Sequence, residues 1–250
     1  LVFLPLGTSY AETPTILASI RPIHSLVSGL TQGLTEPELL IKGLQSPHDY
    51  SLRPSDRRLI SQADLIIYSS PVIEGFLPDI LEPLQTQKRI IDLSRSPGLD
   101  LLAARQLHDH EHHQHNASHD GHIWLSINNA RVMINHLHRI LCDMDPQQQA
   151  HYTANRDRLL SRLDLLNNTI HQQLDAIREQ PFLMFHDAFQ YFEKEFGLNN
   201  ALYVTTGPEH KIGIQRVRYL KQQIKQQNIE CVYYEPPQAP KIIQTIMEGR

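Results

Sequence analysis

Short apolar runs of strand length alternate with segments of helical periodicity in the first part of the chain. The runs stand at 15–20 (TILASI), 38–43 (ELLIKG), 64–70 (DLIIYSS) and 88–94 (KRIIDLS). Pro22 suits the first turn of a helix after the first run, and Ser55 is a candidate cap for a helix over 53–63. A further helix is expected over 73–84. Strand and helix alternating in this way predict a parallel sheet covered by helices on both faces.

The middle of the chain changes character twice. From Ser94 to Gly121 the apolar pattern fails, and we expect a long loop. Helical periodicity returns at Asn128, breaks at Asp145-Pro146 and continues to about Glu179. Apolar residues recur there at spacings of three and four, which favours one packed face: Leu159, Leu163, Leu166, Ile170, Leu174 and Ile177. A helix of this length is predicted to be a rigid connector between two lobes.

The alternation resumes after this helix, with strands expected at 181–186, 201–206 and 230–235. The predicted fold is therefore α/β, with two lobes that are each a parallel sheet flanked by helices, bridged by the long helix. We place the amino-terminal lobe at 12–144 with a His-rich loop at 108–120, the linking helix at 145–179 and the carboxyl-terminal lobe at 180–250. Because the pattern ends on a helix with no closing strand, we expect the second lobe to be truncated at Arg250.

The amino-terminal segment LVFLPLGTSYAET has the features of a secretory signal. Pro5 and Gly7 disfavour a first strand, and Ser9 and Ala11 are small residues at the positions that a signal peptidase inspects. We therefore interpret 1–11 as a signal-peptide remnant. No other segment approaches the ~18 apolar residues of a membrane span, and no Cys near the cleavage point suggests a lipid anchor. These features predict a soluble protein exported to a Gram-negative periplasm.

Composition narrows the function classes. A hydrophobic share of 40% and a charged share of 20% are typical of a globular protein. The net charge of -4 argues against a nucleic-acid partner. The two cysteines, Cys142 and Cys231, form no C-x-x-C motif, which disfavours thiolate zinc and thioredoxin chemistry. A disulfide between them, or one with a partner beyond Arg250, stays open.

The unusual feature of the composition is its fifteen histidines. Many stand in the tract HDHEHHQHNASH, which begins at His108. Within it His108, Glu111 and His112 match H-x-x-E-H, a metalloprotease pattern. That mechanism needs a helix, whereas the tract is rich in Asp, Asn and Ser and has no apolar face. We therefore interpret the match as chance.

Three histidines stand instead at loop positions after predicted strands or at a loop edge: His48, His122 and His186. Imidazole is the commonest neutral zinc ligand, and three of them with an open fourth position suit a tetrahedral ion. Each has a nearby carboxylate that could orient the ring: Asp49, Asp120 and Asp187. Because ligands of parallel sheets bind beyond the carboxyl ends of the strands, we predict a metal site in the cleft between the lobes.

The motifs SPHDYSLRPSD, HIWLS, FHDAFQYFEKEFGL and VYYEPPQ follow one another in this order. Together they resemble the zinc-binding periplasmic component of high-affinity zinc ABC importers, the ZnuA type of the cluster A-I solute-binding proteins. The resemblance spans essentially the whole mature chain. It implies two lobes around one zinc ion held by His48, His122 and His186. It also implies delivery to a membrane ABC permease, no enzymatic activity, no stable membrane insertion and a monomer. Manganese-type relatives carry Glu at the third position, so His186 favours zinc.

Two departures from the family pattern leave the fourth ligand open. Pro47 stands where some members have a ligating Glu, and an Asp-containing turn that supplies a ligand in some relatives would fall beyond Arg250. We expect water as the fourth ligand, with Glu235 as a weaker candidate. Cys231 matches a cysteine that some relatives pair with a carboxyl-terminal partner.

The resemblance also bears on the tract and on the other functions that the three histidines could serve. It implies that the tract at 108–120 collects zinc weakly, with a passive loop as the alternative. A hydrolase using three histidines and a zinc-bound water is the first alternative function. A zinc-binding adhesin or chaperone with the same site is the second.

Overall fold

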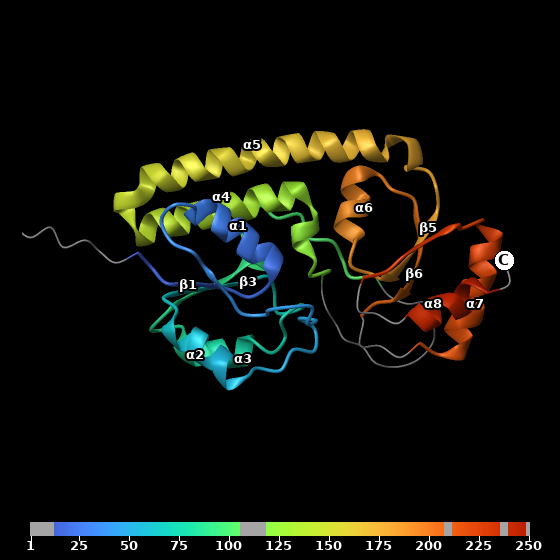
Figure 1. Ribbon diagram of the computed structural model, residues 1–250, viewed down its shortest axis with the longest axis horizontal. Helices are drawn as coiled ribbons and strands as arrows, with labels where there is room; N and C mark the ends of the chain where they lie inside the picture. The colour runs from blue at the N-terminus through green and yellow to red at the C-terminus, as the bar shows by residue number, and fades with distance from the viewer. Residues whose placement is uncertain (1–12, 106–118, 208–211, 236–239, 249–250) are drawn as a thin grey trace, which may run out of the picture.

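The computed structural model describes residues 13–105, 119–207, 212–235 and 240–248, and these form two parallel sheets (Figure 1). The sheet order is β2-β1-β3-β4 in the first, which we call the N-lobe, and β6-β5-β7 in the second, which we call the C-lobe. The strands are β1 (Ile16–Ala18), β2 (Glu38–Leu39), β3 (Leu65–Tyr68), β4 (Arg89–Asp92), β5 (Phe182–His186), β6 (Asn200–Thr205) and β7 (Cys231–Tyr233). The predicted α/β fold is confirmed, because every pair of adjacent strands is parallel.

Helices flank both sheets. They are α1 (Arg21–Thr31), α2 (Pro54–Gln62), α3 (Pro78–Leu81), α4 (Ile127–Met144), α5 (Gln149–Leu174), α6 (Gln190–Phe196), α7 (Ile214–Gln226) and α8 (Pro240–Met247). In the described residues, no helix combines the length and the apolar character needed to cross a membrane.

The core of the N-lobe forms around β1 and β3, which are buried along their whole lengths. Helix α1 covers them with Ile23, Val27 and Leu30, none of which is exposed. Strand β2 is shorter than the predicted run at 38–43. It has only β1 as a neighbour in the sheet, and the chain turns away at Gly43, whose φ is +80°.

Two details of the predicted helices were wrong. Ser55 is not the cap of α2, because the Asp56 carboxylate accepts the Arg53 N–H at 2.7 Å and closes the first turn itself. The helix expected at 73–84 is reduced to α3 and the 3-10 turn η1 (Glu82–Leu84). Pro78 has no backbone N–H to donate, so a helix can begin there but cannot run through it.

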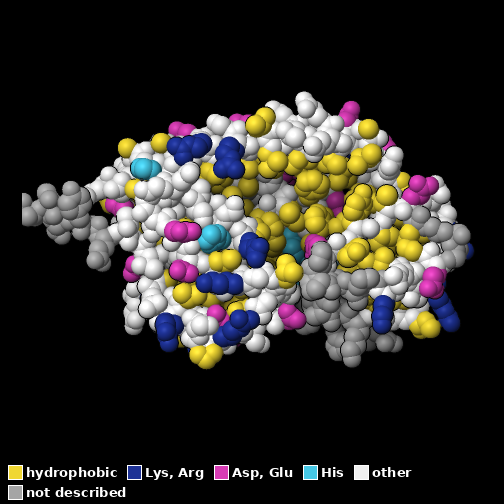
Figure 2. All heavy atoms as spheres, viewed as in Figure 1, with side chains coloured by type: hydrophobic (Ala, Val, Ile, Leu, Met, Phe, Trp, Pro, Cys, Tyr) yellow, Lys and Arg dark blue, Asp and Glu magenta, His cyan; other side chains and the backbone are white. Residues whose placement is uncertain are grey.

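Helix α5 extends along both lobes and packs on α4 and α1 (Figure 1). Asn155 fixes it, because its Nδ2 donates to the carbonyls of Leu30 at 2.8 Å and Gln32 at 2.9 Å. The predicted packed face is confirmed only in its first part, where Leu159 and Leu163 lie against the core. Further along, Leu166 is 47% and Ile177 is 42% exposed. Figure 2 shows hydrophobic side chains gathered beside the long helix and over the C-lobe.

The C-lobe core is smaller and joins the sheet to α7 and α8. Leu183 and Val204 from the strands meet Leu220 and Ile224 of α7. Helix α6 ends at Gly197, which takes a left-handed φ of +63°. Strand β5, central in this sheet, ends at His186.

Candidate metal centre

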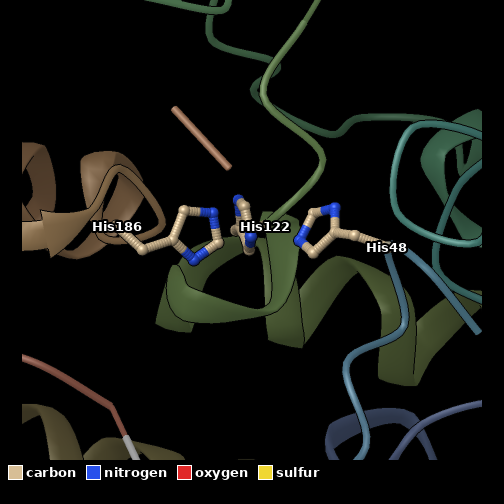
Figure 3. Close-up of side chains that lie close together, drawn as sticks. All are labelled: His48, His122 and His186. Atoms are coloured by element: carbon tan, nitrogen blue, oxygen red, sulfur yellow. The ribbon is translucent and has the colours of Figure 1, made fainter. Parts of the chain in front are cut away.

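Three histidines from distant parts of the sequence meet between the lobes (Figure 3). His48 lies in the loop between β2 and α2. His122 stands directly before the 3-10 turn η3 (Ile123–Leu125), which leads into α4. His186 is the last residue of β5. Two rings therefore come from the N-lobe and one from the C-lobe, and all three point toward a common centre.

The distances fit a group that can enclose a metal ion. The ring centroids lie 5.5 Å apart for His48 and His122, 5.4 Å for His48 and His186, and 5.1 Å for His122 and His186. One nitrogen from each ring lies within 4.8 Å of the others. Ligand nitrogens around a tetrahedral zinc ion are ~3.4 Å apart, as follows from a Zn–N bond of about 2.0–2.1 Å. A small inward movement of the rings would therefore reach zinc geometry.

The contacts of two rings show which nitrogen of each is available for a ligand. The Nδ1 of His122 lies 2.7 Å from Asp120 Oδ1, which leaves Nε2 for a ligand. The Nδ1 of His186 lies 3.7 Å from Glu235 Oε2, while its Nε2 is buried and makes no hydrogen bond. A buried polar atom without a partner is costly unless a ligand or water satisfies it. The unsatisfied Nε2 is thus an atom that a bound metal would satisfy.

Of the three neighbouring carboxylates, the structure pairs one with its histidine. Asp120 orients His122, since its Oδ1 also accepts the His122 backbone N–H at 2.9 Å. Asp187 binds Arg105 at 2.9 Å. Burial raises the pKa of Asp187 to about 6, and the Arg105 guanidinium opposes this rise. Asp49 is exposed to solvent.

A buried carboxylate bonds to two serines that lie against Gly121, the residue before His122. Glu74 is fully buried at the carboxyl ends of β1 and β3, and it accepts hydrogen bonds from the Ser19 hydroxyl and from the N–H groups of Ser69 and Ser70, each N–H at 3.0 Å. Burial raises its pKa to about 7, although the three donors oppose the rise. Sequence reasoning missed Glu74; the available signal was a lone glutamate in the otherwise uncharged stretch YSSPVIEGF.

Gly121 allows this segment to approach the lobe closely. A Cβ at this position would lie 2.7 Å from Cγ1 of Ile73 and 2.9 Å from the Ser70 hydroxyl. A larger residue would therefore force either this segment or the Ile73 and Ser70 side chains to shift. The close approach explains why glycine stands immediately before His122.

Glu235, the two cysteines and the His-rich tract are the other features that the sequence suggested for metal or thiol chemistry. Glu235 lies beside the Nδ1 edge of His186, and among the described residues the metal-capable group consists of the three histidines. Cys142 is half-buried on α4, Cys231 is exposed on β7, and both are free thiols, so the possible pairing between them does not form. The H-x-x-E-H match and most of the His-rich tract fall at 106–118, outside the described residues.

The chain is similar to known zinc-uptake proteins. The family model of ZnuA, described as zinc-uptake complex component A periplasmic, matches residues 16–250. The high-affinity zinc uptake system protein ZnuA of Brucella abortus is 31% identical over 277 residues, covering 97% of this chain and 83% of that protein. The protein of the same name from Yersinia pestis is 31% identical over 252 residues, covering 94% and 79%.

Solved structures show the same fold. A zinc-bound ZnuA deletion mutant superposes with a TM-score of 0.81 at 22% identity, covering 94% of this chain and 86% of that one. The laminin-binding adhesin Lmb of Streptococcus agalactiae gives 0.80 at 21% identity, covering 93% and 84%. With the family model and the relatives at 31% identity, these findings show that the chain belongs to the ZnuA family.

Proposed function

We propose that this protein binds one Zn²⁺ ion through His48, His122 and His186 in the periplasm and delivers it to the membrane permease of an ABC importer. The observation that carries the proposal is the convergence of three imidazoles from two lobes in a chain of the ZnuA family. Imidazole is a good ligand for zinc, whereas manganese and magnesium prefer oxygen ligands, so three histidines favour zinc. Water is the proposed fourth ligand. The zinc ion is cargo here, and the protein acts as a monomer.

The proposed organisation follows from the same site. Residues 12–144 and 180–250 form the two lobes, 145–179 links them, and 1–11 is the remnant of the export signal. Because His186 comes from the C-lobe and the other two histidines from the N-lobe, bound zinc would tie the lobes together. A binding protein needs this coupling so that its permease can distinguish the loaded form. The His-rich tract at 108–120 is proposed to hold further zinc ions weakly.

Zinc titration of chelator-stripped protein tests the proposal. The full chain and a variant lacking 109–118 should both bind one equivalent tightly, and only the full chain should bind further, weaker equivalents. Interspersed His and Asp offer interchangeable sites, each of which loses chain entropy on binding, so their affinity is modest. Loss of the tight equivalent in the deletion variant would place the site in the tract instead. Rapid zinc-dependent ester or peptide hydrolysis would favour the hydrolase alternative.

Asp120→Ala should weaken tight zinc binding by about tenfold, at the lower end of the range for partners that orient a metal-bound histidine. The variant removes the acceptor of the 2.7 Å contact with His122 Nδ1, so the ring loses its fixed orientation. Competition with a chelator of known affinity measures the change. Asp145→Ala is the matched control, since Asp145 is equally buried at 7% and contacts Tyr152 rather than a histidine. Equal affinity in the two variants would contradict the orienting role.

A further inference from the structure

Tyr191 of α6, in the C-lobe, contacts Leu102 and Asp120, two N-lobe residues that precede His122 in the chain. Its hydroxyl accepts the Leu102 N–H at 3.1 Å and donates to the Asp120 carbonyl at 2.8 Å. Leu102 and Asp120 are themselves joined, because the Asp120 N–H donates to the Leu102 carbonyl at 2.8 Å. One hydroxyl group thus forms hydrogen bonds with both of these paired residues. The ring is 3% exposed, so water does not compete for these bonds.

The residue that Tyr191 holds is the one that orients His122. The carbonyl of Asp120 accepts from Tyr191, while its carboxylate faces the ring Nδ1 and backbone N–H of His122. Tyr191 follows His186 by one short turn, at the start of the helix after β5. The same β5–α6 unit therefore supplies one ring of the site directly and fixes a second ring through Asp120.

Arg105 holds α6 in the position that this contact requires. Its guanidinium donates to Asp187 Oδ1 at 2.9 Å and to Glu193 Oε2 at 2.6 Å. The side chains of the two acceptors are 6% and 4% exposed and that of Arg105 is 29% exposed, so solvent reaches these charge-assisted bonds only from the Arg105 side. Helix α6 also packs beside η3, directly after His122 (Figure 1). Asp187 precedes α6 and Glu193 lies within it, so Arg105 fixes α6 against the N-lobe.

We propose that Tyr191 is a positioning residue for the metal site, and that its hydroxyl couples the C-lobe to the orientation of His122 through Asp120. This inference rests on the proposed function, because it takes the three histidines as the zinc ligands. The hydroxyl contact joins a C-lobe helix to two N-lobe residues in the observed arrangement. A separation of the lobes that broke this contact would release Asp120 and His122 together with His186, which would make release of the ion cooperative.

Tyr191→Phe tests the coupling by deleting one oxygen atom. Tyr152→Phe is the matched control, since Tyr152 is fully buried and its hydroxyl donates to Asp145, away from the site. Burial raises the pKa of both phenols to about 12, so both are neutral over the assay range. Zinc should dissociate from Tyr191→Phe about tenfold faster than from the wild type, because the loss of groups that hold metal ligands in place typically weakens metal binding by about this factor. The rate should not change in Tyr152→Phe.

A spectroscopic measurement separates positioning from a general loss of stability. Co²⁺ bound in place of zinc has visible absorption bands that report ligand geometry, and these should change in Tyr191→Phe only. The double variant Tyr191→Phe with Asp120→Ala should release zinc no faster than Asp120→Ala alone, because both act through one path. A wild-type release rate and spectrum in Tyr191→Phe would overturn the inference and leave the zinc site intact. Absence of tight zinc binding in the wild type would overturn both proposals.

Discussion

His186→Ala should abolish tight zinc binding, because it removes the C-lobe ligand and leaves two imidazoles that both belong to the N-lobe. Zinc sites with four protein ligands have apparent binding free energies of ~10–16 kcal/mol, or about 3 kcal/mol for each ligand. The loss should therefore be at least about a hundredfold in affinity. The same change should remove about 3 kcal/mol of the stabilisation that a given zinc concentration confers. Chelator competition measures the first effect, and thermal unfolding with and without zinc measures the second.

His138→Ala is the matched control for this substitution. His138 is 8% exposed compared with 5% for His186, and its Nε2 contacts the Thr153 hydroxyl at 3.0 Å in the packing between α4 and α5. Burial, followed by the nearby Arg156, lowers the pKa of His138. Both variants lose a buried imidazole ring, but only His186→Ala should lose zinc. Tight binding that survives in His186→Ala would show that the three-histidine site is not the zinc site.

Glu74→Gln should change the pH dependence of the free energy of unfolding. The pKa of Glu74 is raised from 4.5 to about 7 by burial, so its native form holds a proton that the unfolded chain has already released. The stability contributed by this proton is complete below pH 4.5 and is lost as the pH rises through about 7. At ~1.4 kcal/mol for each pH unit, the loss between pH 5 and pH 8 is about 2 to 3 kcal/mol.

Glutamine cannot titrate, so the variant should gain this amount relative to the wild type between pH 5 and pH 8. Its amide nitrogen will oppose a backbone N–H of Ser69 or Ser70, which lowers stability at every pH and leaves the slope unaffected. Urea unfolding of the metal-free protein at several pH values measures the difference. Glu38→Gln, at an exposed position of β2, is the control for removing a carboxylate from the surface of the same lobe. A constant difference between wild type and Glu74→Gln would contradict the prediction.

Much of the fold is encoded in local sequence patterns. Buried strands such as 64–70 are short apolar runs, and Gly197 marks the end of a helix because it can adopt a positive φ. The predictions were wrong where a local signal had two possible outcomes. Ser55 and Asp56 both have side chains that can cap a helix, and in α2 the Asp56 carboxylate accepts the Arg53 N–H. In α5 the apolar spacing continues beyond Leu163, but a stripe of this kind does not say where its partner surface ends.

The sequence by itself determined the kinds of groups in the site and the chain positions where they stand. His48, His122 and His186 follow strands or a loop edge, and the carboxyl ends of parallel strands meet at one edge of a sheet. The tertiary structure alone decided which groups support them. Asp120 rather than Asp187 orients a neighbouring histidine, because Arg105 occupies Asp187. Tyr191 contacts the Asp120 carbonyl from 71 residues away. Such contacts depend on how two lobes dock, and no local periodicity records the docking of surfaces that are distant in the chain.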